Sequence, residues 1–257
     1  MKHLYFFGAM CVAISASAAV KTEMIEYKDG ETVLQGMIAY DDASTAKRPG
    51  VVVVHEWWGL NDHAKNSAKK LAELGYVAFA ADMYGKGVFT DDPAEAGKKS
   101  GALKGDRAAL RKRAKAAVDS LRAYKYTDSA KIGAMGYCFG GTTALEIARS
   151  GEPVKGVVSF HGALGSPTPP DAKNIKGRVL VCHGADDPFV SAAEVAAFKK
   201  EMDDAKVKYQ FIAYPAAVHS FTNPDVDRHG MEGAKYNAAA DKKSWEDMKA
   251  FFAAAFQ

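Results

Sequence analysis

A cysteine between two glycines is the residue in this chain best placed to do chemistry. Gly136-Tyr137-Cys138-Phe139-Gly140 follows the apolar run Lys131–Met135. In this pattern a strand turns sharply into a helix and exposes a nucleophile. The free N–H groups at the start of such a helix favour a thiolate, the form of cysteine that attacks acyl carbon. We therefore predict that Cys138 is a nucleophile, with an inert buried cysteine as the alternative.

A cysteine nucleophile needs a base to take its proton and a carboxylate to orient that base. After a nucleophile of this kind, the acid comes next along the chain and the histidine follows it. Asp187 follows the seventh expected strand and His219 follows the eighth. Both therefore end at the edge of a parallel sheet where active sites form. We assign Asp187 as the acid, and we interpret its neighbour Asp186 as a solvated or turn-forming residue.

The segment His55-Glu56-Trp57-Trp58-Gly59 ends the third expected strand. In folds with this nucleophile turn, that segment supplies a second backbone donor to the oxyanion. We predict Trp57 N–H as this donor, beside Phe139 N–H. A carboxylate at the mouth of a thiol site can take the thiol proton or stabilise its resting form, so Glu56 is a third catalytic candidate. A structural ion pair is the alternative role for Glu56.

Aromatic residues in loops at the same sheet edge predict an apolar pocket. The candidates for its walls are Trp58, Tyr84, Tyr137, Phe189 and Phe221. His55, His161 and His183 also end expected strands, but histidines there commonly satisfy local backbone groups, so we expect no metal site. The glycines around Cys138 lack the lysine and spacing of a nucleotide loop, and we expect no cofactor.

Eight apolar runs rich in valine, isoleucine and aromatic residues predict strands. A short turn over Lys28–Glu31 joins the first two, and helical patterns separate the later ones, which predicts a mixed, mostly parallel sheet. Asn61 and Gly75 bound one helix, Ser191 and Glu194 form a capping box before another, and a final helix runs over about 238–256. The predicted strands are Glu23–Tyr27, Thr32–Tyr40, Gly50–His55, Tyr76–Asp82, Lys131–Tyr137, Val154–His161, Arg178–His183 and Val207–Tyr214.

The first residues have the form of a removable export signal. Lys2 supplies a positive start, 4–14 are mostly apolar, and Ala16-Ser17-Ala18 is a cleavage site. We predict a signal peptide over 1–18, one α/β domain over 19–257, and export to the periplasm or medium. The residues before Cys11 lack a lipoprotein pattern, which disfavours a lipid anchor. No later segment has the length of apolar chain that a membrane helix needs.

The charge balance argues against a nucleic-acid partner. The chain has 34 basic and 31 acidic residues, a net charge of +3, and removal of Lys2 with the signal leaves +2. A basic cluster over 107–115 alternates with apolar residues, as in a solvated helix face. We expect a monomer with a small-molecule ester or lactone substrate and no integral membrane segment.

Two cysteines remain after cleavage of the signal, Cys138 and Cys182. A disulfide between them must be considered in an oxidising compartment. Cys182 lies within a separate buried strand, and a bridge would occupy the proposed nucleophile. We therefore predict that Cys182 is a core residue without a partner.

Taken together, five motifs resemble those of the dienelactone hydrolase family. The resemblance covers nearly all of the chain after the signal and implies an α/β-hydrolase fold with little or no lid. It also implies a Cys138-His219-Asp187 triad, with Glu56 activating the thiol when substrate arrives. The motifs are His55–Asn61, Ala81–Gly85, Gly136–Gly141, His183–Val190 and His219–Phe221.

The resemblance fails at two substrate-binding positions. Dienelactone hydrolases hold the carboxylate of their lactone with two arginines, and the matching residues here are Lys86 and Asn223. A lysine can attract a carboxylate as a point charge but cannot form the bidentate fork, and asparagine carries no charge. We include Lys86 and Asn223 among the predicted pocket residues and expect an altered substrate.

The leading hypothesis from the sequence is hydrolysis of a small ester, lactone or thioester by Cys138. A second hypothesis is that the aromatic cleft binds a hydrophobic small molecule without turnover, because a fold does not fix a function. A third is a redox-sensing thiol, which ranks last because Cys138 has no nearby resolving cysteine in the sequence.

Overall fold

The computed structural model describes residues 19–257. The predicted signal peptide over 1–18, with Cys11 inside it, lies outside the described residues.

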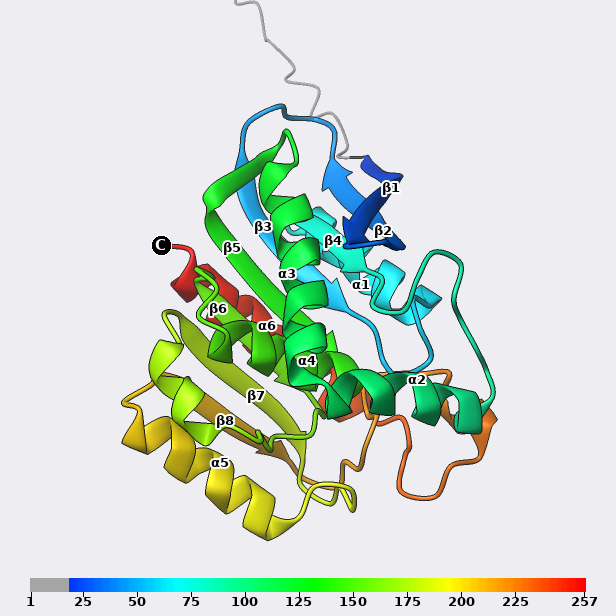
Figure 1. The fold of residues 1–257 in the computed structure, drawn as a ribbon, viewed down its shortest axis with the longest axis vertical. Coiled ribbons are helices and arrows are strands. Elements are labelled where there is room, and N and C mark those ends of the chain that lie inside the picture. The colour runs from blue at the N-terminus through cyan, green and yellow to red at the C-terminus, as the bar shows by residue number, and fades with distance from the viewer. Residues whose placement is uncertain (1–18) are drawn as a thin grey trace, which may run out of the picture.

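Eight strands form one sheet in the described chain, in the order β1-β2-β4-β3-β5-β6-β7-β8 (Figure 1). Strand β2 pairs antiparallel with β1 and with β4, and all other neighbours are parallel. The predicted mixed, mostly parallel sheet is therefore confirmed. The strands are β1 (Val20–Asp29), β2 (Thr32–Asp41), β3 (Arg48–Val54), β4 (Val77–Ala81), β5 (Thr127–Tyr137), β6 (Gly156–Phe160), β7 (Arg178–Gly184) and β8 (Tyr209–Tyr214).

Helices cover both faces of the sheet (Figure 1). Helices α1 (Asp62–Glu73) and α6 (Ala238–Ala255) pack on one face. Helices α3 (Arg107–Ala123), α4 (Phe139–Arg149) and α5 (Ala192–Asp204) pack on the other. Helix α2 (Pro93–Gly105) packs against α3, and two short 3-10 helices, η1 (Pro169–Asn174) and η2 (Val226–His229), lie in loops.

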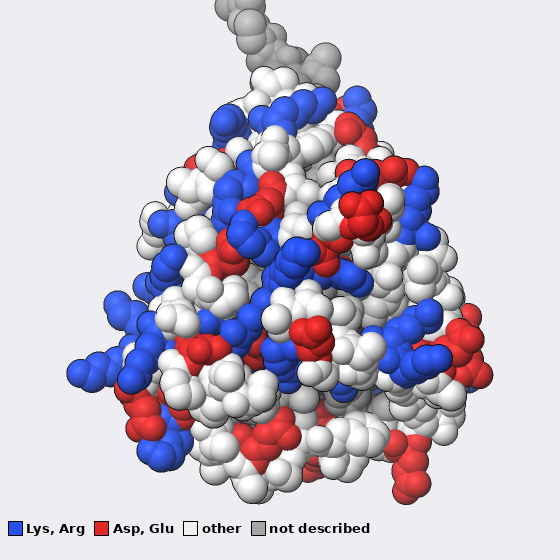
Figure 2. Space-filling model, in the orientation of Figure 1, with Lys and Arg blue, Asp and Glu red and all other residues white. Residues whose placement is uncertain are grey.

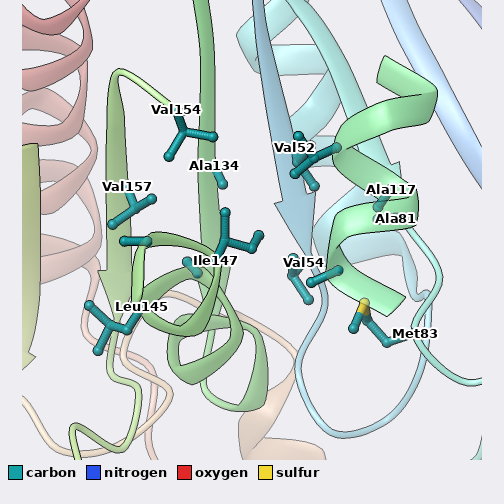
Figure 3. Packing of buried hydrophobic residues seen from close by; sticks show 14 of the residues in the cluster. Val52, Val54, Ala81, Met83, Ala117, Ala134, Leu145, Ile147, Val154 and Val157 are labelled. Atoms are coloured by element: carbon teal, nitrogen blue, oxygen red, sulfur yellow. The ribbon is translucent and has the colours of Figure 1, made fainter. Parts of the chain in front are cut away.

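The valine run of β3 shows why both layers are needed. Successive side chains of a strand point to opposite faces of the sheet. Val52 and Val54 belong to the core shared with α3 and α4, whereas Val51 and Val53 belong to the core shared with α1 and α6. Figure 3 shows Val52 and Val54 facing Ala117 of α3. All four valines are fully buried, as a strand covered on both faces requires.

A buried ionic cluster ties α4 to its neighbours. The Arg149 guanidinium is fully buried and donates to Glu201 at 2.8 and 2.6 Å and to Glu146 at 3.1 Å. Arg111 of α3 donates to Glu146 at 2.8 Å and to Asp171 of η1 at 2.6 Å. Two arginines therefore bridge three carboxylates that come from α4, α5 and η1. We call these five residues the Arg149 cluster.

The basic helix face over 107–115 is only partly solvated, which corrects the prediction. Lys112 and Lys115 have exposed side chains. Arg111 lies in the Arg149 cluster, and Arg113 donates to Asp29 at 3.2 Å and to the Met83 carbonyl at 3.1 Å. The periodicity shows that a helix forms, but it does not show which cations meet acids from other elements. Figure 2 shows basic and acidic residues interspersed over this face.

The predicted capping box at α5 forms only in part. The Ser191 hydroxyl accepts the Glu194 N–H at 3.1 Å. The Glu194 carboxylate does not return to the helix start but accepts the N–H groups of Leu164 and Gly165, at 2.6 and 3.0 Å. Glu194 therefore holds the loop that follows β6. Within residues 19–257, no helix is long and apolar enough to cross a membrane.

Candidate active site

Cys138 occupies a strained turn between β5 and α4. Its φ is 53°, a left-handed conformation that is costly for a residue other than glycine. The two glycines of the motif are needed for space. A Cβ on Gly136 would lie 2.2 Å from the Gly140 carbonyl oxygen, and one on Gly140 would lie 2.2 Å from the Val54 carbonyl oxygen. The backbone of the turn therefore packs directly against the end of β3.

The backbone of Cys138 is held by β6 and the residue after it. Its N–H donates to the Phe160 carbonyl at 3.0 Å and to His161 Nδ1 at 3.1 Å. Because Nδ1 accepts, the proton of His161 resides on Nε2, which lies 2.8 Å from Thr222 Oγ1. Burial, and next the charge of His219, hold the pKa of His161 well below its usual range. A neutral His161 thus joins the turn of Cys138 to the loop of His219.

His219 and Asp187 form a hydrogen-bonded pair. His219 Nδ1 lies 2.9 Å from Asp187 Oδ2, and the other oxygen of Asp187 accepts the Phe189 N–H at 2.9 Å. Burial lowers the pKa of His219, but the charge of Cys138 and the hydrogen bond with Asp187 outweigh it and raise the pKa to about 10. Asp187 is buried whereas Asp186 is exposed, so Asp187 is the acid that orients His219.

Glu56 lies behind the His219 loop as a buried carboxylate. Asn223 Nδ2 donates to its Oε2 at 2.6 Å, and the Ser220 hydroxyl donates to its Oε1 at 3.1 Å. His63 Nδ1 lies 3.5 Å from Oε2. Burial raises the pKa of Glu56, but the nearby His63 and the hydrogen bond from Asn223 outweigh it and lower the pKa to about 2. Glu56 is therefore ionised.

No hydrogen bond joins Glu56 to Cys138 in the described chain. The structure instead links Glu56 to the base through Ser220, the residue after His219. Ser220 has a φ of 54°, so the His219 loop is strained at this residue, as the nucleophile turn is at Cys138. Glu56 is positioned to fix the His219 loop.

Cys138 and His219 line one cavity of about 300 Å³, together with Phe139. Its walls are largely apolar and come from the loops after β3, β6, β7 and β8, from α2 and from the start of α4. Trp58 and Phe189, two of the predicted pocket residues, line it, as does Trp57. The other lining residues are Lys104, Thr142, Ala163, Val190, Ser220, Val226, Met231 and Ala234.

Three predicted aromatic wall residues lie elsewhere. The Tyr137 hydroxyl lies 2.9 Å from Ser67 of α1, because strand alternation turns this side chain toward the α1 and α6 face. Phe221 is fully buried in the same core. Tyr84 packs on Phe139 and donates to the Trp57 carbonyl at 2.9 Å, so it supports the wall from behind.

Lys86 and Asn223 also lie outside this cavity. Lys86 is half-exposed and pairs with Glu26 of β1, and Asn223 donates to Glu56. The sequence reasoning missed Lys104, which is the only lysine or arginine among the residues lining the cavity. Lys104 lies on α2, and nothing in its local sequence signals this placement.

The predicted oxyanion donors have no competing acceptor. Neither the Trp57 N–H nor the Phe139 N–H has a hydrogen-bond partner within residues 19–257. Phe139 is the first residue of α4, so its N–H adds to the positive end of the helix dipole. Both residues line the cavity that holds Cys138.

The histidines at the other strand ends bind local groups or pack against neighbours. His55 Nε2 accepts the Met83 N–H at 3.1 Å, and its Nδ1 contacts the Glu56 carbonyl. His183 packs against Phe211. Among residues 19–257, no group of three or more histidines, cysteines or acids is arranged to hold a metal ion.

Both cysteines of the described chain are free thiols. Cys182 is fully buried on β7, and burial raises its pKa to about 12. The prediction that Cys182 is a core residue is confirmed.

Comparison with known proteins gives consistent matches. The model of the dienelactone hydrolase family matches residues 34–256. Protein usf of Aquifex pyrophilus is 33% identical over 208 residues, covering 78% of this chain and 87% of its own. A putative carboxymethylenebutenolidase of Aquifex aeolicus is also 33% identical, over 206 residues, with the same coverage.

Two solved structures are similar along their whole length. One, named m3DLH, is 45% identical with a TM-score of 0.90 and covers 93% of this chain and 100% of its own. The other is a dienelactone hydrolase-like promiscuous phosphotriesterase from metagenomic libraries. It is 42% identical with a TM-score of 0.89 and covers 94% of this chain and 100% of its own.

Proposed function

The chain belongs to the dienelactone hydrolase family of the α/β-hydrolase superfamily, and from this membership we propose that it hydrolyses small esters, lactones or thioesters with Cys138 as nucleophile. The observation that carries the proposal is the juxtaposition at one cavity of Cys138 and a His219 that is hydrogen-bonded to Asp187.

The reaction follows from the positions of these groups. The Cys138 thiolate attacks the carbonyl carbon, and the N–H groups of Phe139 and Trp57 bind the oxyanion. Collapse of the intermediate breaks the bond to the alcohol or thiol, which takes a proton from the His219 imidazolium. Water then attacks the acyl-cysteine, gives a proton to His219, and releases the acid and the thiolate.

Glu56 acts in this proposal as a positioning residue. It holds Ser220, and through Ser220 the loop of His219, in a strained conformation. Direct activation of the thiol by Glu56 would require a rotation that breaks its hydrogen bonds with Asn223 and Ser220.

The cavity favours an uncharged apolar substrate over dienelactone. Lys86 pairs with Glu26 outside the cavity, and Asn223 binds Glu56, so neither offers a cation to a substrate carboxylate. The cavity is lined by one cation, Lys104, in place of the two arginines that hold the carboxylate in dienelactone hydrolases. We expect short aryl esters to react faster than dienelactone.

The test is hydrolysis of p-nitrophenyl acetate and butyrate and of a dienelactone by the protein and its variants. Cys138→Ser and His219→Ala should each lose at least about a thousandfold in kcat/KM. Cys182→Ala is the matched control, because it removes a thiol from the core and should keep the activity of each folded molecule. Unchanged turnover in Cys138→Ser would refute the proposal. Binding of a hydrophobic ligand without turnover of any ester would favour the binding hypothesis.

Phosphotriesters are a second class of substrate to test. The relative at 42% identity is described as a promiscuous phosphotriesterase, and the proposed thiolate would attack phosphorus and expel an aryloxide from the same cavity. Hydrolysis of diethyl p-nitrophenyl phosphate that Cys138→Ser abolishes would support this activity. If Cys138→Ser lost ester hydrolysis but kept phosphotriester hydrolysis, Cys138 would not be the nucleophile for phosphotriesters.

Export remains a proposal drawn from residues 1–18. Expression of the full chain in a bacterial host, followed by periplasmic fractionation and N-terminal sequencing, tests it. A periplasmic protein beginning at Ala19 is the expected result. A cytoplasmic protein that retains Lys2 would argue against export. We also propose a monomer, which light scattering of the purified protein tests.

A further inference from the structure

A second cavity lies beside the one that holds Cys138. It has a volume of about 460 Å³, and its walls include Leu60, Phe89, Asn223 and His229. Trp58 is the only residue in the described chain that lines both cavities. Trp58 therefore lies at the boundary between an apolar chamber with the nucleophile and a larger, more polar chamber without it, and we call its side chain the partition.

The partition is held on both sides. The Trp58 ring stacks on the His229 ring, with centroids 4.1 Å apart and planes 15° apart, and it also contacts the Trp57 ring at 4.8 Å. The Trp58 carbonyl accepts the Thr90 N–H at 3.0 Å. Only 3% of Trp58 is exposed. A ring fixed in this way excludes a substrate chain from the space behind it.

The stacked His229 is itself linked to the loop that precedes α2. Its neighbour Arg228 donates to Asp91 at 2.9 Å, in the loop that precedes α2, and Arg228 Nε lies 3.3 Å from His229 Nε2. This contact links η2 to the segment that also binds the Trp58 backbone. The partition therefore has support from two loops that are distant in sequence.

We propose that Trp58 determines specificity by limiting the length of the substrate that reaches Cys138. With the ring in place, a substrate must fit the cavity of about 300 Å³ that holds Cys138, at the lower end of the usual size for small-molecule sites. Removal of the ring joins this cavity to the second one and admits a long acyl chain. This inference rests on the proposed hydrolase function.

The first test compares p-nitrophenyl octanoate with p-nitrophenyl acetate. The ratio of their kcat/KM values should rise at least about tenfold in Trp58→Ala, because one apolar group in a pocket already changes discrimination by about that factor. Phe89→Ala is the matched control, since Phe89 lines only the second cavity and is largely exposed. It should leave the ratio unchanged. A ratio within about twofold of wild type in Trp58→Ala would overturn the proposal.

A second measurement does not depend on hydrolysis. Cys138 is alkylated with iodoacetamide or with the bulkier fluorescein-5-maleimide, and mass spectrometry of the Cys138 peptide gives the two rates. Trp58→Ala should raise the bulky-to-small rate ratio, and an unchanged ratio would refute the partition. If no ester is turned over by any variant, this ratio still tests the partition while the proposed function fails.

His229→Ala provides a variant that keeps the Trp58 ring. Loss of the stacked partner should free the ring and raise both ratios by a smaller factor than Trp58→Ala. This variant decides the question if Trp58→Ala does not fold, as judged by its thermal unfolding. Unchanged ratios in a folded His229→Ala protein would then overturn the proposal, because the ring would not depend on its stacked partner to block the substrate.

Discussion

Two regions of this molecule bury carboxylates. The groups that pair with these carboxylates differ between the two regions. In the Arg149 cluster, permanently charged guanidinium groups face the buried Glu146 and Glu201 and the partly exposed Asp171. Behind the site, Glu56 is fixed by two uncharged donors, Asn223 and Ser220, with a histidine nearby. The first arrangement cannot change its charge near neutral pH, because arginine stays protonated.

This difference distinguishes carboxylates that hold the fold together from a carboxylate that positions a catalytic residue. Charges that must hold helices together are paired with permanent charges, and removal of one partner leaves an uncompensated ion in the core. Glu56 is held by uncharged donors, so loss of either donor removes a hydrogen bond but no counter-charge, and one of the donors belongs to the loop of the base. The same chemical group therefore has a scaffolding role in one place and a positioning role in the other.

The largest expected effect is from Arg149→Met. This change strands Glu201 without its buried partner, leaves Glu146 with Arg111 alone, and should lower the free energy of unfolding by about 3–5 kcal/mol. Urea unfolding at pH 7 measures it, and the activity per folded molecule should not change. Lys200→Met, which breaks an exposed pair with Asp204, should cost nothing measurable. If Arg149→Met lowered the free energy of unfolding as little as Lys200→Met, the Arg149 cluster would not have the structural role assigned to it.

Glu56→Gln tests the charge of Glu56 through the pH dependence of the free energy of unfolding. The pKa of Glu56 falls from 4.5 to about 2 on folding, and at 1.36 kcal/mol per pH unit the ionised carboxylate contributes about 3 kcal/mol. Because the folded pKa is the lower one, this stability is present above pH 4.5 and fades as the pH falls toward 2. The gap in unfolding free energy between wild type and Glu56→Gln should shrink over that window. A gap that does not depend on pH would contradict the assigned charge.

Asn223→Leu should have a smaller effect. It removes the shortest hydrogen bond to Glu56 and leaves Oε2 less well satisfied, which should cost about 1–3 kcal/mol of stability. Thermal unfolding and the pH dependence of stability measure the loss, which should vanish in the Glu56→Gln background. Additive losses in the double variant would show that the two side chains act independently.

Ser220→Ala should have the smallest effect on stability, about 1 kcal/mol. Its readout is catalytic, because the hydroxyl links Glu56 to the loop of His219. We expect kcat to fall several-fold with KM nearly unchanged. Thr168→Ala is the matched control, since its hydroxyl contacts Arg111 in the Arg149 cluster and should not affect kcat. If Ser220→Ala and Thr168→Ala changed kcat equally, Ser220 would have no special role in positioning His219.

The sequence predicts the sheet well because its signals are local. Each strand is an apolar run between turn residues, and the order of the chemical motifs along the chain matches a known family. The candidate site residues at strand ends could be placed together for the same reason, since parallel strands end at one edge. Strand alternation could also have shown that Tyr137 faces away from the cavity, because Met135 and Tyr137 share a face.

The cavity walls could not be predicted because they depend on contacts between distant segments. Lys86 is drawn to Glu26 by the register of the first hairpin, and Lys104 reaches the cavity from a helix that lacks a strong apolar face. Likewise, no local pattern shows that His229 stacks on Trp58. Such placements are decided by the packing of loops.

Helix α2, which carries Lys104 to the cavity, buries only Ala96, Ser100 and Leu103. Three of its 13 residues are glycine, each costing about 1 kcal/mol of helix stability relative to alanine. By contrast, every residue of α4 is buried. Local opening is cheapest where few apolar contacts are lost, so the amide protons of α2 should exchange with solvent well before those of α4. We therefore expect the wall formed by α2 to open locally more often than the turn that holds the nucleophile.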